Sequence, residues 1–134
     1  MNTISDCKMI KLKDHDARNG ILNAIDFTSL PFVPKRCFYV YGVTDNEERG
    51  LHAHYKTEQI LFCLKGLCIV SISDGKKQKT ITLNNPNTGI YIPAMIWDSQ
   101  IYGYDTILMV LSSTKYNGTD YIHDYEEFKR LKNG

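Results

Sequence analysis

The feature that most constrains the fold is a series of short segments rich in Val, Ile, Tyr and Phe, separated by Gly, Pro, Asn and Asp. Such side chains fit a pleated, half-buried surface, and the separating residues favour turns. Many short strands at near-regular spacing are typical of a sandwich or barrel. The predicted strands are 7–13, 20–25, 35–43, 51–53, 58–64, 68–73, 77–83, 89–92, 96–99 and 106–112.

Turn and helix signals complete this all-β prediction. Asp74-Gly75 is predicted to be the two-residue turn of a type I′ hairpin, because both central positions of that turn need positive φ. Only the C-terminal segment looks helical, with Asp124 as N-cap. Its apolar face is formed by Tyr125, Phe128 and Leu131. We therefore expect a jelly roll of two packed antiparallel sheets with a cavity at one end and a short C-terminal helix.

Length and charge bound the domain organisation and the partners. The 134 residues contain no repeat and no linker, so we expect a single domain over 1–134. With 43% hydrophobic and 23% charged residues, the composition is that of an ordinary soluble protein. A net charge of +1 favours neither a nucleic acid nor a membrane surface as partner.

Two further features favour a cytoplasmic location. The segment Met1–Lys13 has no apolar signal-peptide core, and the apolar run from Ile60 to Val70 is too short to span a bilayer. The four cysteines show no CxxC spacing, so we interpret them as free thiols that pack as small apolar residues.

The strongest chemical signal is the pair His52 and His54. In an extended segment, residues two apart point to the same side, so two imidazoles converge on one volume. Imidazole moves protons near neutral pH, and it is also the commonest metal ligand. With Glu58, the pair could form a two-histidine, one-carboxylate face for non-haem Fe(II). The alternative without a chemical role is that His52 and His54 are polar residues on an exposed strand face.

These residues lie in strings that resemble a known fold family. His52-x-His54-x-x-x-Glu58, followed by Gly66, resembles the first cupin motif, and residues 89–97 occupy the place of the second. Metal-binding cupins usually have another histidine in the second motif, where this chain has Trp97. The resemblance therefore implies a cupin jelly roll and favours proton transfer over metal binding.

A more specific resemblance covers nearly the whole chain. The string from Glu48 to Gln59, ERGLHAHYKTEQ, is similar to the signature of the dTDP-sugar 3,4-ketoisomerases, and the similarity continues in residues 35–41, 83–93 and 120–128. Departures include Tyr55, where the family often has Lys, and Leu67, where it often has a small polar residue. The resemblance implies an isomerase that acts on dTDP-4-keto-6-deoxyglucose without a cofactor or metal, in the synthesis of deoxyamino sugars for surface polysaccharides.

The implied reaction moves a ketone from C4 to C3 of a hexose. It needs a base at C3, an acid at C4 and donors that stabilise the enediolate. We expect His52 and His54 to be the catalytic pair, and Tyr39 to be a phenol donor, although Tyr39 could equally be a packing residue. Which histidine is the base, and whether C4 becomes galacto or gluco, stay open.

The candidate substrate-binding residues are mostly cationic. Arg18, Arg49 and Lys56 suit a pyrophosphate, although each could be a solvated surface charge. Arg36 is a further candidate, and alternation places it on the opposite side of its strand from Tyr39. Gln59 could hold a sugar hydroxyl, and Trp97 could stack on the substrate or seal the core.

The leading hypothesis is thus a metal-independent ketoisomerase for a dTDP-linked 4-keto-6-deoxy sugar. A terminal strand that adds to a neighbouring sheet edge would make a homodimer with a swapped N-terminal strand. The alternatives are a metal-dependent cupin enzyme that uses His52, His54 and Glu58, and a non-catalytic cupin that binds a sugar nucleotide.

Overall fold

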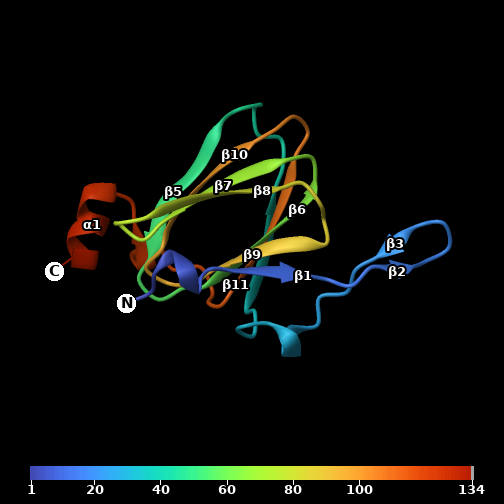
Figure 1. The fold of residues 1–134 in the computed structure, drawn as a ribbon, viewed down its shortest axis with the longest axis horizontal. Helices are drawn as coiled ribbons and strands as arrows, with labels where there is room; N and C mark the ends of the chain where they lie inside the picture. The colour runs from blue at the N-terminus through green and yellow to red at the C-terminus, as the bar shows by residue number, and fades with distance from the viewer. Residues whose placement is uncertain (134) are drawn as a thin grey trace.

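The computed structural model describes residues 1–133 and shows two antiparallel five-stranded sheets packed face to face (Figure 1). The first sheet contains, in spatial order, β1 (Lys8–Lys11), β9 (Thr88–Ile92), β6 (Gln59–Lys65), β11 (Ile107–Ser112) and β4 (Arg36–Val40). The second sheet contains β12 (Tyr121–Ile122), β5 (Glu48–His54), β10 (Trp97–Tyr102), β7 (Cys68–Ser73) and β8 (Gln78–Leu83). The predicted all-β jelly roll with two packed antiparallel sheets is confirmed.

Two short strands form a hairpin outside this sandwich. Strands β2 (His15–Asp16) and β3 (Ile21–Leu22) pair with each other and extend away from the sheets (Figure 1). Of the predicted strand 20–25, only Ile21–Leu22 forms a strand, which is β3. Short 3-10 turns occur at Ile4–Asp6, Phe27–Ser29 and Gly118–Asp120.

The hydrophobic residues lie in three layers because several strands are covered on both faces. Leu61 and Cys63 of β6 face the second sheet, whereas Ile60 and Phe62 face outward and are covered by the segment that contains Leu30. This double coverage explains why β6 is apolar without alternation. Cys63 and Cys68 are buried in the core, as expected for small apolar residues, whereas Cys37 is exposed.

The C-terminal helix α1 (Tyr125–Asn133) confirms the predicted helix and its cap. The Asp124 carboxylate accepts a hydrogen bond of 3.0 Å from the backbone N–H of Glu126. Phe128 is fully buried, and Tyr125 and Leu131 pack beside it against Trp97 and Ala53. No helix in residues 1–133 is long and apolar enough to cross a membrane.

The hairpin between β7 and β8 differs from the prediction by one residue. The backbone N–H of Asp74 donates to the carbonyl of Lys77, so the central turn residues are Gly75 and Lys76. Only Gly75 has positive φ, at 90°. The Asp74 carboxylate also accepts the N–H groups of Lys76 and Lys77, and this local bonding moves the turn away from type I′.

Candidate active site

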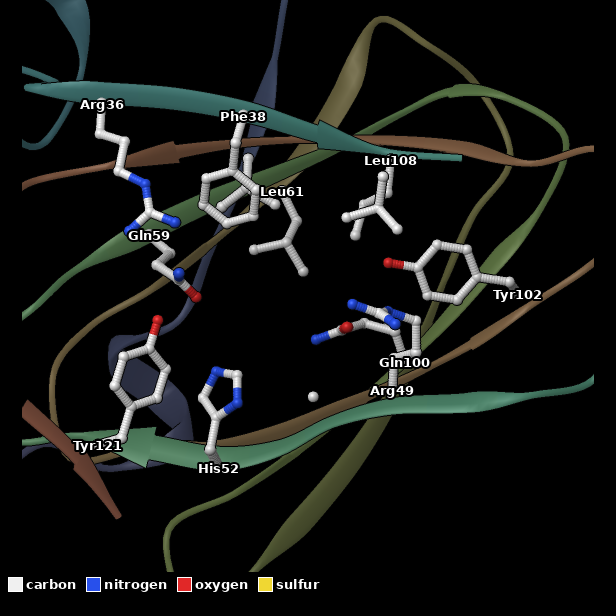
Figure 2. Close-up of a pocket in the computed structure, with 13 residues that line it drawn as sticks. Arg36, Phe38, Arg49, His52, Gln59, Leu61, Gln100, Tyr102, Leu108 and Tyr121 are labelled. Atoms are coloured by element: carbon white, nitrogen blue, oxygen red, sulfur yellow. The ribbon is translucent and has the colours of Figure 1, made fainter. Parts of the chain in front are cut away.

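A cavity of about 180 Å³ lies between the two sheets (Figure 2). Alternation along each strand sends every second side chain into this space. The first sheet contributes Arg36, Phe38, Val40, Gln59, Leu61, Leu108 and Val110. The second sheet contributes Arg49, Gly50, His52, Gln100, Tyr102 and Tyr121.

The two predicted histidines meet beside this cavity. His52 lines it, and His54 lies in an adjoining narrow recess with Arg36, Gln59 and Tyr121. The two imidazole centroids are 4.9 Å apart. The Tyr121 ring lies 5.1 Å from the His52 ring and 4.5 Å from the His54 ring, so one phenol contacts both imidazoles.

Burial sets the protonation state of this pair. Removal from water lowers the pKa of His52 below its ordinary value. His54 is only 5% exposed, and burial followed by the charge of His52 lowers the pKa of His54 to about 4. Both imidazoles are therefore neutral near pH 7, and a neutral imidazole is the form that accepts a proton.

A guanidinium, an amide and a phenol lie at the histidine end of the cavity, and Figure 2 shows them as Arg36, Gln59 and Tyr121. The Arg36 guanidinium lies 4.5 Å from the centroid of the Phe38 ring, which restricts its position. Arg49 lines the other end near Tyr102. Arg36, Arg49 and Gln59 are thus brought to the cavity, in line with the sequence-based expectation.

Two predicted site residues lie on the wrong faces of their strands. Tyr39 of β4 is 65% exposed and points away from the cavity, because its neighbours Phe38 and Val40 take the inward positions. Tyr39 was predicted to be either a phenol donor or a packing residue, and in this structure it does not line the cavity. Trp97 packs on the outer face of the second sheet, with its ring 5.2 Å from that of Tyr125. Trp97 is therefore a packing residue in this chain.

Three other candidates also lie outside the cavity. Arg18 is exposed in the turn of the β2–β3 hairpin, and Lys56 is exposed in the loop after β5. Glu58 does not join the histidines, because its carboxylate accepts a hydrogen bond from the Tyr91 hydroxyl. Residues 1–133 contain no group of three or more His, Cys, Asp or Glu side chains arranged to hold a metal ion. The donor set of the metal-dependent alternative therefore does not assemble.

Sequence reasoning missed Tyr121, Gln100 and Tyr102 as cavity residues. Tyr121 belongs to a two-residue strand, which is too short to show a periodic pattern. Its only sequence signal is the string from Asp120 to Ile122, which is part of the family resemblance. Gln100 and Tyr102 lie beyond the predicted end of the strand 96–99, because β10 continues to Tyr102.

A jelly roll with paired histidines beside a cavity between its sheets has the architecture of a cupin. The chain belongs to the family described as FdtA, WxcM-like C-terminal, whose model matches residues 5–133. The ketoisomerase resemblance seen in the sequence is thereby confirmed.

Characterised relatives are similar over most of their length. The chain is 38% identical, over 116 residues, to TDP-4-oxo-6-deoxy-alpha-D-glucose-3,4-oxoisomerase from Aneurinibacillus thermoaerophilus, covering 86% of this chain and 84% of the relative. A 3,4-ketoisomerase from Helicobacter canadensis superposes with a TM-score of 0.92 at 36% identity, covering 96% and 98% of the two chains. QdtA, a sugar 3,4-ketoisomerase from Thermoanaerobacterium thermosaccharolyticum solved with TDP, gives 0.91 at 32%, covering 96% and 95%.

Proposed function

We propose that this chain is a 3,4-ketoisomerase that converts dTDP-4-keto-6-deoxyglucose to a dTDP-3-keto-6-deoxyhexose. The observation that carries the proposal is the position of the His52 imidazole at the wall of a cavity, beside His54 and Tyr121. A relative that covers most of the chain is named as an oxoisomerase for this 4-oxo sugar. A second relative was solved with TDP, which supports a TDP-linked substrate.

The reaction needs one base and one stabilised oxyanion. His52 takes the proton from C3, and the electron pair of the broken C–H bond forms a C3–C4 double bond while the C4 oxygen becomes an enediolate. The Tyr121 hydroxyl is the proposed donor to that oxygen, because its ring contacts both histidines at the cavity wall. Delivery of a proton to C4, with transfer of the proton on the C3 oxygen to the C4 oxygen, yields the 3-ketone and a hydroxyl group at C4.

The two histidines have different proposed roles because their surroundings differ. His52 lines the cavity and can reach a substrate, so we assign it as the base. His54 is almost fully buried in the adjoining recess, so it is assigned as the orienting partner of His52 and Tyr121. The low pKa of His54, at about 4, keeps it uncharged and avoids repulsion when His52 becomes protonated.

The diphosphate of the substrate would need cations near the cavity. Arg36 and Arg49 are the proposed contacts, because both line it and guanidinium groups bind phosphate oxygens in pairs. The Gln59 amide, which is 7% exposed and lies next to Arg36, is the proposed contact for a sugar hydroxyl.

A homodimer is the proposed assembly. Exposed apolar side chains occur on β1, β4 and the nearby loops, with Met9 at 49%, Tyr39 at 65% and Val33 at 68% exposure. Strand β1 pairs with β9 of its own chain at the sheet edge, and an exchange of β1 between two copies would keep the same register. Sedimentation equilibrium at micromolar concentration tests this proposal, and a monomer would contradict it.

The proposed function also places the enzyme in a reaction sequence. A 3-keto sugar nucleotide is a substrate for an aminotransferase, so the product suits the synthesis of deoxyamino sugars. We propose a cytoplasmic location, which agrees with free thiols at all four cysteines.

One proton NMR time course tests the activity. Purified protein with dTDP-4-keto-6-deoxyglucose and a chelator should form the 3-keto sugar, and in D₂O the C3 proton should exchange. The couplings at C4 then report the product configuration. Failure to form the 3-keto sugar would refute the ketoisomerase proposal. Tight binding without turnover would favour a non-catalytic sugar-nucleotide protein, and turnover that is lost with the chelator would favour a metal enzyme.

A further inference from the structure

A fully buried carboxyl group lies on the cavity side of β10 and has no part in the proposed proton transfer. Asp98 is 1% exposed, and its cross-strand partner on β5 is His52. Its Oδ2 atom is the one buried side-chain polar atom without a hydrogen-bond partner in residues 1–133. A buried, unpartnered carboxyl oxygen costs stability, so a function for Asp98 has to be sought.

The other carboxyl oxygen connects Asp98 to the cavity. Asp98 Oδ1 accepts a hydrogen bond from Nε2 of Gln100, two residues along the same strand. Gln100 is itself 7% exposed and lines the cavity together with His52. Asp98 therefore lies one hydrogen bond behind a group that a bound sugar would contact.

Strand β5, which pairs with β10 in the same sheet, leaves space for the Gln100 amide. Gly50 of β5 has a φ of +84°, a conformation that favours glycine. A Cβ atom built on Gly50 would lie 2.9 Å from Gln100 Nε2 and 3.2 Å from Gln100 Oε1. Any other residue at position 50 would displace the amide, so the backbone of β5 and the carboxyl of Asp98 together define its place.

The direction of the amide follows from donor and acceptor chemistry. A glutamine amide has a donor end and an acceptor end, and its Nε2 group donates to Asp98 Oδ1. The NH₂ group of Gln100 therefore faces Asp98. The Oε1 atom of Gln100 has no hydrogen bond within the described part of the chain, and it is left for a donor in the cavity.

We propose that Asp98 is a positioning residue that fixes the Gln100 amide, so that Gln100 Oε1 accepts a hydrogen bond from a hydroxyl group of the bound sugar. This inference rests on the proposed function for the identity of the ligand. It assigns to Gln100 a contact with the sugar, because Gln100 lines the cavity together with the proposed base His52.

The stability of Asp98 variants distinguishes a positioning role from a merely structural role. Burial raises the pKa of Asp98 to about 7, which shows that its charged form is disfavoured inside the sandwich. Replacement of such a group by an apolar residue of similar volume is often neutral or stabilising. A positioning role thus predicts that Asp98→Leu impairs sugar binding while the thermal midpoint stays equal or rises, whereas a structural role predicts a lower midpoint.

The test is a double-mutant cycle with Asp98→Leu, Gln100→Leu and the double variant. Each single variant should raise KM for dTDP-4-keto-6-deoxyglucose by about tenfold, the size of one lost hydrogen bond, and the double variant should be no worse. The Kd for TDP alone should stay within about twofold. Asp98→Asn keeps an acceptor oxygen and should restore most of the affinity. Ser99→Ala, on the outer face of the same strand, is the matched control and should leave KM unchanged.

Three outcomes would overturn the proposal: an unchanged KM in Asp98→Leu, additive effects in the double variant, or a loss of TDP affinity equal to the loss of substrate affinity. A second measurement does not depend on turnover. In ¹⁵N NMR spectra, the side-chain NH₂ signals of Gln100 should shift in Asp98→Leu and stay in place in Ser99→Ala. Unchanged signals in Asp98→Leu would refute the positioning of the Gln100 amide by Asp98. If the wild type has no isomerase activity but these shifts occur, the proposed function fails while the positioning role of Asp98 stands.

Discussion

The two walls of the cavity differ in chemistry although they come from similar sheets. Apart from Arg36 and Gln59, the wall from the first sheet is lined by apolar side chains such as Phe38, Leu61 and Val110. The wall from the second sheet carries His52 and Tyr121 together with further polar side chains. The polar wall is equipped for proton transfer, whereas the apolar wall removes water from the groups opposite.

The apolar wall influences the chemistry of the polar wall. The apolar wall contributes to the burial that lowers the pKa of His52 and of His54. Substitutions on the polar wall should therefore reduce activity and spare stability, and truncations on the apolar wall should reduce stability. The predictions below test this separation.

The largest expected effect is the loss of the base on the polar wall. His52→Asn should lower kcat by about 10²–10⁴-fold, because asparagine cannot take the C3 proton. Its unfolding midpoint should stay close to that of the wild type. Steady-state kinetics with dTDP-4-keto-6-deoxyglucose and thermal unfolding measure the two effects. His15→Asn, on the exposed hairpin, is the control and should retain full activity. Near-wild-type turnover in His52→Asn would remove the assigned role.

A smaller loss is expected when the polar wall loses one hydroxyl. Tyr121→Phe should lower kcat by about 10²-fold, because one donor to the developing oxyanion is lost while the ring contacts with both histidines stay. The matched control is Tyr116→Phe, since Tyr116 is 68% exposed. Equal rates in the two variants would show that the Tyr121 hydroxyl has no contact with the reacting oxygen.

On the apolar wall, truncation should act on stability. Leu61→Ala should lower the free energy of unfolding by about 2–5 kcal/mol, because Leu61 is 1% exposed and packs between the sheets. Leu64→Ala on the same strand is the control, and its 42% exposure predicts a change of about 0.5 kcal/mol or less. Urea unfolding measures both variants. Similar losses in the two would mean that the apolar wall is not close-packed.

The smallest effect is a pH dependence of stability with opposite signs at two residues of the second sheet. The pKa of His54 falls from 6.5 to about 4 on folding, so the unfolded chain binds more protons and stability is lost as pH falls through that range. The pKa of Asp98 rises from 3.8 to about 7, so stability is lost as pH rises through that range.

Urea unfolding of two variants between pH 4 and pH 7 separates these contributions. His54→Asn should lose less stability than the wild type as pH falls towards 4, and Asp98→Asn should gain relative to the wild type as pH rises towards 7. Parallel stability curves for the wild type and both variants would contradict the burial of these two groups.

Most of the fold could be predicted from local patterns, and the errors have physical causes. Nine of the ten predicted segments became strands of the sandwich because alternation, turn residues and burial agree there. The segment 20–25 looked equally strand-like, but only Ile21–Leu22 forms a strand, and it pairs with β2 in a small hairpin outside the sandwich. Strand β12 was missed because two residues cannot carry a period.

For the site, the sequence indicated which segments of the chain carry functional residues, but it was less informative about which way their side chains point. It nominated His52, Arg36 and Gln59 as site residues, and all three line the cavity. It left Tyr39 and Trp97 open between a role at the site and packing, because residue type suggests chemistry while the face of the strand decides access, and neither residue lines the cavity.

By itself, the sequence determined the jelly roll, the histidine pair and the family, since these depend on residue order and on spacing within single strands. Only the tertiary structure decided which side chains share the cavity with that pair. Tyr121 reaches His52 and His54 through the pairing of β12 with β5, and Asp98 lies beside His52 through the pairing of β10 with β5. Cross-strand register is set by the packing of the whole sandwich, so no local pattern in the chain encodes it.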